Sequence, residues 1–110
     1  MKKISIQFVS AEGVTSVNGY QSPTPGIGIY HDTIWTHKHE WRLVHLASGY
    51  VMGAFRTRKV AARAAELHNT LGVDWTQGFE ELRQIPDLAD KSDAASMIAT
   101  LEDTAAQEAK

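Results

Sequence analysis

The fold is indicated most clearly by residues 40–72, which read EWRLVHLASGYVMGAFRTRKVAARAAELHNTLG. Successive side chains of a strand point to opposite faces, so along residues 41–46 Trp41, Leu43 and His45 would share one face and Arg42, Val44 and Leu46 the other. A small-residue connection at 47–49 is followed by a second run of strand-forming residues at 50–55. This pattern predicts a β-hairpin.

The same stretch continues directly into a helix. The Thr57 hydroxyl is suited to cap its first turn, and Gly72 is suited to the left-handed position that ends many helices. Between them, apolar residues recur at helical spacing: Val60, Ala64, Leu67 and Leu71. We therefore expect a helix over residues 58–71.

The sequence before the hairpin contains further strand signals. Residues 4–9 alternate like a strand, and Asn18-Gly19 is the dipeptide most typical of a tight hairpin turn. Two prolines make residues 22–26 a loop, because proline cannot donate a hydrogen bond to a sheet. Residues 27–35 are a plausible further strand.

The sequence after the hairpin is helical in character. Asp74 and Gln77 resemble the cap of a short helix with Trp75, Phe79 and Leu82 on its apolar face. Residues 87–110 are rich in alanine and acidic residues, and they fit a docked helix, a partner-binding helix or a frayed tail. The predicted fold is α+β: an antiparallel sheet of four to five strands packed on one main helix, with a short helix and a C-terminal helix added. Residues 1–86 would form the domain and residues 87–110 an acidic tail.

Composition excludes several kinds of chemistry. The chain has 110 residues and no cysteine, which rules out disulfides, thiolate metal sites and cysteine nucleophiles. The sequence contains no Gly-x-Ser-x-Gly elbow and no phosphate-binding P-loop. No apolar run is long enough to span a membrane. We expect a cytoplasmic, non-catalytic protein without a cofactor.

Histidines are the one metal-binding candidate in the sequence. His37 and His39 are two positions apart, a spacing that puts two imidazoles on one face of a strand. His31, Asp32 or Glu40 would have to supply a third ligand. The simpler interpretation is a polar strand end whose imidazoles meet solvent or carboxylates.

Charge is distributed unevenly along the chain. Six cations lie between positions 38 and 63, where Glu40 is the one acid, whereas ten of the thirteen acids follow position 63. Such asymmetry indicates a surface for a polyanion, charge complementarity within the chain, or two solvated faces. Arginine and lysine gather where the second hairpin strand meets the helix, and free amides at a helix start favour phosphate. The candidate nucleic-acid or partner-binding residues are Lys38, Trp41, Arg42, Arg56, Arg58, Lys59 and Arg63.

The hairpin beginning at Trp41 and the segment Gly53-Ala54-Phe55-Arg56-Thr57-x-x-x-Ala61-Ala62-x-Ala64 resemble the AP2-type DNA-binding module and the arm-binding domains of phage integrases. The resemblance covers residues 40–72 and implies a three-stranded sheet packed on one helix, with Phe55 and Thr57 structural at the junction. It also implies DNA contacts from the exposed sheet face, where Lys38, Trp41 and Arg42 match. The strand at 50–55 departs from the pattern because it carries no basic residue.

The general character of the chain also resembles small accessory proteins of phages and plasmids. We therefore expect a small binding protein that engages nucleic acid or a nucleoprotein through its sheet face and basic strand–helix junction. The alternative is an inhibitor of host machinery, such as a defence nuclease complex, that binds a protein partner through its acidic C-terminal segment. A histidine-ligated metal protein is the third hypothesis.

Overall fold

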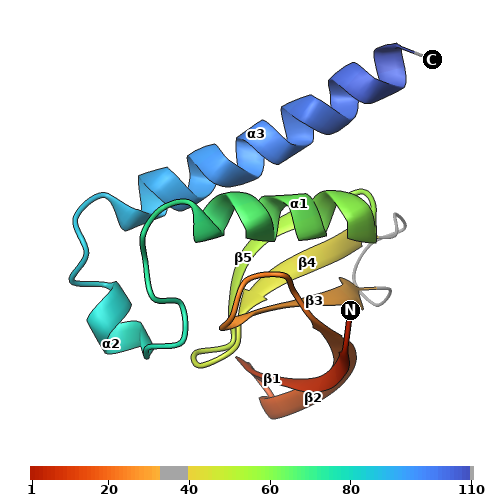
Figure 1. Ribbon diagram of the computed structural model, residues 1–110. Helices are drawn as coiled ribbons and strands as arrows, with labels where there is room; N and C mark the ends of the chain where they lie inside the picture. The colour runs from red at the N-terminus through yellow and green to blue at the C-terminus, as the bar shows by residue number, and fades with distance from the viewer. Residues whose placement is uncertain (33–39, 110) are drawn as a thin grey trace.

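The computed structural model describes residues 1–32 and 40–109, which form a five-stranded antiparallel sheet and three helices. The strands follow one another across the sheet in chain order (Figure 1). They are β1 (Lys3–Ser10), β2 (Gly13–Gln21), β3 (Ile27–Asp32), β4 (Glu40–His45) and β5 (Tyr50–Phe55). The helices are α1 (Arg58–Asn69), α2 (Phe79–Leu82) and α3 (Leu88–Glu108). The predicted α+β fold is confirmed.

The main core lies between the sheet and α1. One face of β3, β4 and β5 contributes Ile27, Ile29, Leu43 and Phe55. Against it pack the small side chains of α1, chiefly Ala61, Ala64 and Ala65, together with Ala99 of α3. Alanines on a helix allow it to approach a sheet closely. The buried face of α1 is centred on these alanines, whereas Val60, Leu67 and Leu71 are only partly buried around it.

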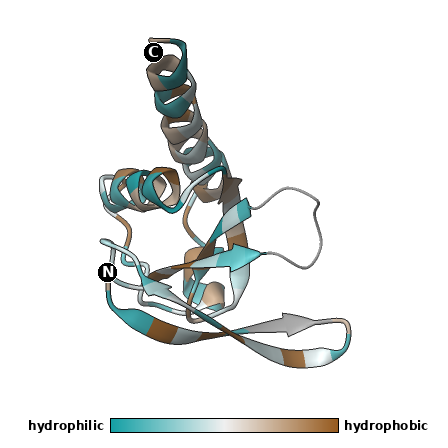
Figure 2. Cartoon of the chain, turned by 90° about the vertical axis from the view of Figure 1, so that its right-hand side faces the viewer, coloured by the Kyte–Doolittle hydropathy of each residue, from teal (hydrophilic) through white to brown (hydrophobic). Residues whose placement is uncertain are grey.

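A smaller second core lies on the opposite face of the sheet. Ile6 of β1 packs with Tyr30 and Val44 there. This is possible because the β1–β2 hairpin curls beneath the other strands instead of continuing flat beside them (Figure 2). Only Tyr20 and Gln21 at the end of β2 pair with β3.

The turn predicted at Asn18-Gly19 is wrong. Asn18-Gly19 is not a turn but lies inside β2, paired with Ser5 and Ile4, and the turn is at Ala11–Glu12. Glycine is needed at position 19 for close approach: a Cβ there would lie 2.5 Å from the Ile29 carbonyl oxygen and 2.5 Å from Ile6 Cδ1. The glycine thus lets β2 cross tightly over β3.

Other local features agree better with the predictions from sequence. Thr57 caps α1 by accepting a hydrogen bond from the Val60 amide at 3.2 Å. The helix ends at Asn69, two residues before the predicted end, and Gly72 follows with a left-handed φ of 72°. The pairing of β4 with β5 shifts register between Leu43 and Val44, so that Met52 is an extra residue next to Gly53. A glycine in mid-strand is typical of a bulge or of a close approach by another group, and Gly53 has both features, because a Cβ there would lie 3.0 Å from Phe55 Cζ.

The predicted short helix is shorter than expected. It covers only Phe79–Leu82, and Trp75 lies before it, buried in the main core. Asp74 instead caps a turn by accepting a hydrogen bond from the Thr76 amide at 3.0 Å. Phe79, expected on the apolar face, is 49% exposed.

Residues 87–110 were expected as a docked helix, a partner-binding helix or a frayed tail. The structure describes them to residue 109 as α3, which runs antiparallel to α1 and packs along it (Figure 1). Its buried residues are Ala95 and Ala99. None of the helices in the described part of the chain has an apolar stretch of the length that a membrane crossing requires.

Candidate nucleic-acid interface at the start of helix α1

The strand–helix junction places several cations around one point. Phe55 anchors the end of β5 in the core at 5% exposure, and Thr57, two residues later, caps the start of α1. The chain turns through this junction with Arg56, Arg58 and Lys59 all exposed. The sequence therefore predicted correctly that these charges lie together at a helix start.

The acidic helix α3 neutralises part of this charge. Arg56 donates two hydrogen bonds to the Asp103 carboxylate, at 2.9 and 3.1 Å, and Arg63 donates to Glu102 at 3.1 Å. These hydrogen bonds raise the pKa of both arginines. Because the two arginines are exposed, the pairs are screened by salt and are open to competition from another anion.

Arg58 has a different environment, which is aromatic. Its guanidinium lies 4.8 Å from the centre of the Tyr20 ring and 6.0 Å from Trp41. Trp41 in turn stacks on His31, with ring centres 4.5 Å apart and planes 5° from parallel. Cations over aromatic faces are attracted to the ring quadrupole. We refer to Arg58, Tyr20, Trp41 and His31 as the Arg58 cluster.

Sheet register explains why these rings meet. Trp41 and His31 are cross-strand partners in the β3–β4 pair, and Tyr20 pairs with Ile29, two residues before His31 on the same face. The first residue of α1 is Arg58, which lies over that face. Sequence reasoning proposed Trp41 and Arg58 for this surface but not Tyr20, and it named His31 only as a possible metal ligand.

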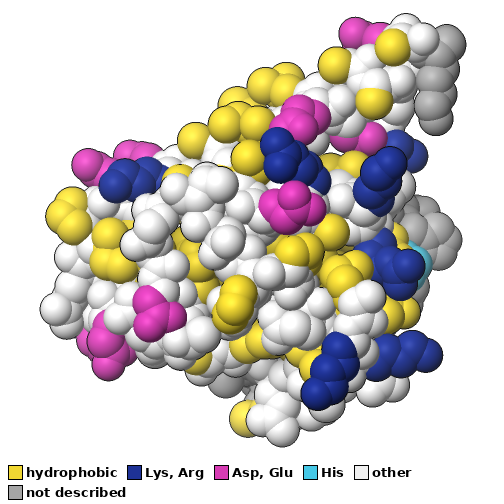
Figure 3. Space-filling model, viewed as in Figure 1, with side chains coloured by type: hydrophobic (Ala, Val, Ile, Leu, Met, Phe, Trp, Pro, Cys, Tyr) yellow, Lys and Arg dark blue, Asp and Glu magenta, His cyan; other side chains and the backbone are white. Residues whose placement is uncertain are grey.

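Two lysines extend the positive charge beyond the cluster. Lys3 is the cross-strand partner of Tyr20, and the Lys2 carbonyl accepts a hydrogen bond from the Gln21 amide at 2.8 Å. Lys2, Lys3, Arg58 and Lys59 are all exposed. Lys and Arg side chains accordingly follow one side of the molecule from α1 down to the N-terminal strand (Figure 3). We call these four residues the positive edge.

Arg42 is separated from this edge. Successive side chains of β4 point to opposite faces of the sheet, so Arg42 lies on the face opposite Trp41. There its guanidinium forms ion pairs with the carboxylates of Asp32 at 2.8 Å and Glu40 at 3.2 Å. Burial on this face raises the pKa of Tyr30, its cross-strand partner. Trp41 and Arg42 therefore do not form one contact surface.

The remaining candidates fall outside the described residues. Lys38, His37 and His39 lie within positions 33–39, so their predicted roles stay predictions. Within residues 1–32 and 40–109, no three histidine or carboxylate side chains gather closely enough to hold a metal ion.

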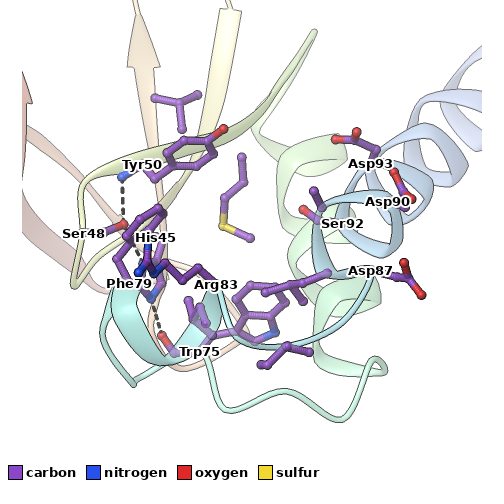
Figure 4. A pocket seen from close by; sticks show the side chains of 16 residues that line it. His45, Ser48, Tyr50, Trp75, Phe79, Arg83, Asp87, Asp90, Ser92 and Asp93 are labelled. Carbon is purple, nitrogen blue, oxygen red and sulfur yellow. Dashed lines mark hydrogen bonds between the residues drawn. The ribbon is translucent and has the colours of Figure 1, made fainter.

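A pocket of about 570 Å³ lies at the other end of the sheet, between β5, α2 and the start of α3 (Figure 4). His45 lies in its wall. Its Nε2 is 2.9 Å from the Trp75 carbonyl oxygen and 3.0 Å from that of Gln77, so in the neutral ring Nε2 carries the proton. Nδ1 then accepts a hydrogen bond from the Ser48 hydroxyl at 2.7 Å.

This serine–histidine pair has a structural explanation. The Ser48 oxygen also accepts from the Tyr50 amide, which closes the β4–β5 turn, and carbonyl groups orient the histidine. In a catalytic triad the group that orients the histidine is a carboxylate, not a carbonyl, and its charge stabilises the imidazolium. His45 thus fixes the turn to the segment around Trp75.

Comparison with known proteins gives no match, whether to a family model, a curated protein or a solved structure. Any function must therefore be inferred from the chain's own residues.

Proposed function

We propose that this protein is a non-catalytic binding protein that engages nucleic acid, free or in a nucleoprotein, through the positive edge and the Arg58 cluster. The observation that carries the proposal is the Arg58 guanidinium over the Tyr20 ring, 6.0 Å from Trp41. It joins a cation for phosphate to flat groups on which bases stack, the combination used by proteins that bind single strands.

The surrounding charges support this assignment. Lys3 lies across from Tyr20, and Lys59 follows Arg58 at the start of α1. No acidic residue belongs to the first turn of α1, so the positive end of the helix dipole adds to the side-chain charge. A phosphate backbone running along the positive edge would meet all four cations in turn.

The ion pairs on α3 set the limits of the interface. Arg56 and Arg63 already have carboxylate partners, so a nucleic acid has to displace Asp103 and Glu102 to reach them. We therefore assign the main contacts to Arg58, Lys59, Lys2 and Lys3. An interface made of these four cations and the Arg58 cluster predicts moderate affinity with little sequence preference.

The test is fluorescence anisotropy with labelled single-stranded DNA, single-stranded RNA and duplex DNA. Four phosphate contacts to a single strand predict an affinity loss of about 50-fold between about 50 mM and about 200 mM salt. The double variant Arg58→Ala/Lys59→Ala should weaken binding across sequences. The matched control is Arg83→Ala, which removes an exposed arginine at the C-terminal end of α2, at the other end of the molecule.

Two results would contradict the proposal. The first is the absence of salt-dependent binding to all three nucleic acids at low salt. The second is equal loss in the Arg83→Ala control, which would mean that binding reflects overall charge and not the positive edge.

A further inference from the structure

The outward face of α3 carries large apolar side chains. Met97, Ile98 and Leu101 are 63%, 47% and 60% exposed, although the helix buries Ala95 and Ala99 against the body. In Figure 3 the hydrophobic side chains lie along the upper side of this helix. Exposed apolar side chains gathered on one face are a typical feature of interaction sites.

The spacing on this face is that of a helix–helix seam. Positions alternately four and three residues apart bring side chains to one line along a helix, as in a coiled coil. On α3 this line passes through Ala94, Met97, Leu101 and Thr104, with Ile98 beside it. Glu102 and Asp103 still pair with Arg63 and Arg56, and beyond them the end of α3 extends past the start of α1 (Figure 1).

A carboxylate lies at each end of this seam. Continuing the same spacing reaches Asp90 before Ala94 and Glu108 after Thr104, and both are exposed. They are 18 positions apart, which is about 27 Å along a helix. A partner in contact with Met97 and Leu101 therefore also meets a negative charge at each end.

We propose that the outward face of α3 binds an amphipathic helix of another protein that has an apolar seam and lysine or arginine at each end. The apolar seam would cover Met97, Ile98 and Leu101, and the two cations would pair with Asp90 and Glu108. This proposal is independent of the nucleic-acid interface, which uses residues on β1, β2, β3, β4 and α1.

Charge disfavours a second copy of this chain as the occupant. In an antiparallel pair, the register that stacks Met97 on Leu101 of the other copy also brings Asp90 opposite Glu108 at both ends. In a parallel pair each carboxylate meets its own copy. Either arrangement places like charges together at both ends of the seam, and basic residues there would instead be complementary.

Fluorescence anisotropy with two synthetic helical peptides tests the proposal on the full-length protein. The peptides share a leucine seam, and one carries lysine at both ends while the other carries glutamate. We expect the lysine peptide to bind and the glutamate peptide to bind at least about tenfold more weakly. The variant Met97→Gln/Leu101→Gln should lower the affinity for the lysine peptide at least about tenfold. Val14→Gln on β2, which also replaces an exposed apolar residue, is the matched control.

A charge-reversed variant sharpens the result. Asp90→Lys/Glu108→Lys should reverse the preference in favour of the glutamate peptide. Equal binding of both peptides, or of neither, would overturn the proposal. A dimer of the wild-type protein in sedimentation velocity that Met97→Gln/Leu101→Gln dissociates would assign the face to a second copy and overturn it as well.

Discussion

Arg56 and Asp103 lie 47 residues apart in the chain and are joined by two hydrogen bonds of 2.9 and 3.1 Å. With the neighbouring Arg63–Glu102 pair, they align the acidic helix α3 beside the basic junction that starts α1. The unequal charge distribution of the sequence is thus partly satisfied within the molecule. Within residues 1–32 and 40–109, Arg58, Lys59 and the two lysines at the start of the chain lie exposed beside this junction.

This arrangement predicts that α3 competes with nucleic acid for the two arginines. The variant Glu102→Gln/Asp103→Asn removes two negative charges beside Arg56 and Arg63, so nucleic-acid affinity should rise. A gain of about 3-fold to 10-fold at low salt is expected, and it should shrink as salt screens the charges. Titrations of labelled single-stranded DNA measure the change. Neutralising Glu80, whose ion-pair partner is Arg83 on the distant α2, should leave the affinity unchanged.

Gly19 should be intolerant of any side chain. The added methyl of Gly19→Ala would meet the Ile29 carbonyl and the buried Ile6, and neither can move without disturbing the sheet. Overpacking of this kind predicts a loss of about 1–3 kcal/mol in the free energy of unfolding, measured by urea denaturation. Asn18→Ala, at the exposed neighbouring position, should change it by less than about 0.5 kcal/mol. If both variants were equally damaging, the pair would be acting as a turn.

His68 should make stability depend on pH. Its Nδ1 donates to the Ala64 carbonyl at 2.7 Å and its Nε2 accepts from the Ser92 hydroxyl at 2.7 Å, which links α1 to α3. Burial lowers the pKa of His68 below its ordinary value of 6.5. The unfolded chain then binds a proton at a higher pH than the folded chain does. The stabilising contribution is therefore complete above pH 6.5 and is lost as pH falls from there to the folded-state pKa.

Denaturation curves at neutral and mildly acidic pH test this linkage. Wild type should lose stability on acidification, and His68→Gln should show a smaller change between the two pH values, whatever its absolute stability. His31→Gln, at an exposed histidine, provides the comparison. An unchanged pH dependence in His68→Gln would assign the effect to other groups.

Thr24 should anchor the proline-containing loop to the main helix. It is 1% exposed, and its hydroxyl donates to the Ala65 carbonyl at 2.6 Å. Thr24→Val keeps the shape but removes the donor, so we expect a loss of about 1–2 kcal/mol in the free energy of unfolding. Thr76→Val, at an exposed hydroxyl, should cost less in the same thermal or urea melt. A neutral Thr24→Val would show that packing alone holds the loop.

Ser96 offers the opposite case, a substitution that should stabilise. Among the residues the structure describes, its buried hydroxyl finds no hydrogen-bond partner, and it lies on α3 where the helix passes Gly53. Ser96→Ala removes this unsatisfied group and improves helix propensity, so a gain of about 0.5–1.5 kcal/mol is expected. Ser92→Ala, which removes the hydroxyl bound to His68, should instead destabilise. A loss of stability in Ser96→Ala would contradict the assignment.

Much of the fold followed from local sequence signals. The 40–72 hairpin, the start of the helix, the Thr57 cap and the left-handed Gly72 were predicted because each depends on neighbouring residues. The Asn18-Gly19 prediction failed because its local turn preference was overridden by contacts with Ile6 and Ile29, which are distant in sequence. The Arg58 cluster was found only in part for the same reason: Tyr20 reaches it through sheet topology.

The sequence by itself therefore determined the hairpin–helix unit and the presence of basic and acidic segments. Periodicity, capping and turn residues act over a few positions, so they can be recognised without knowing where the rest of the chain lies. Only the tertiary structure decided which charges neutralise each other and which stay exposed. Acidic residues of helix α3 pair with Arg56 and Arg63, whereas Arg58 lies over the Tyr20 ring. Ion pairing depends on the distance between charges, and only the packing of the folded chain sets that distance.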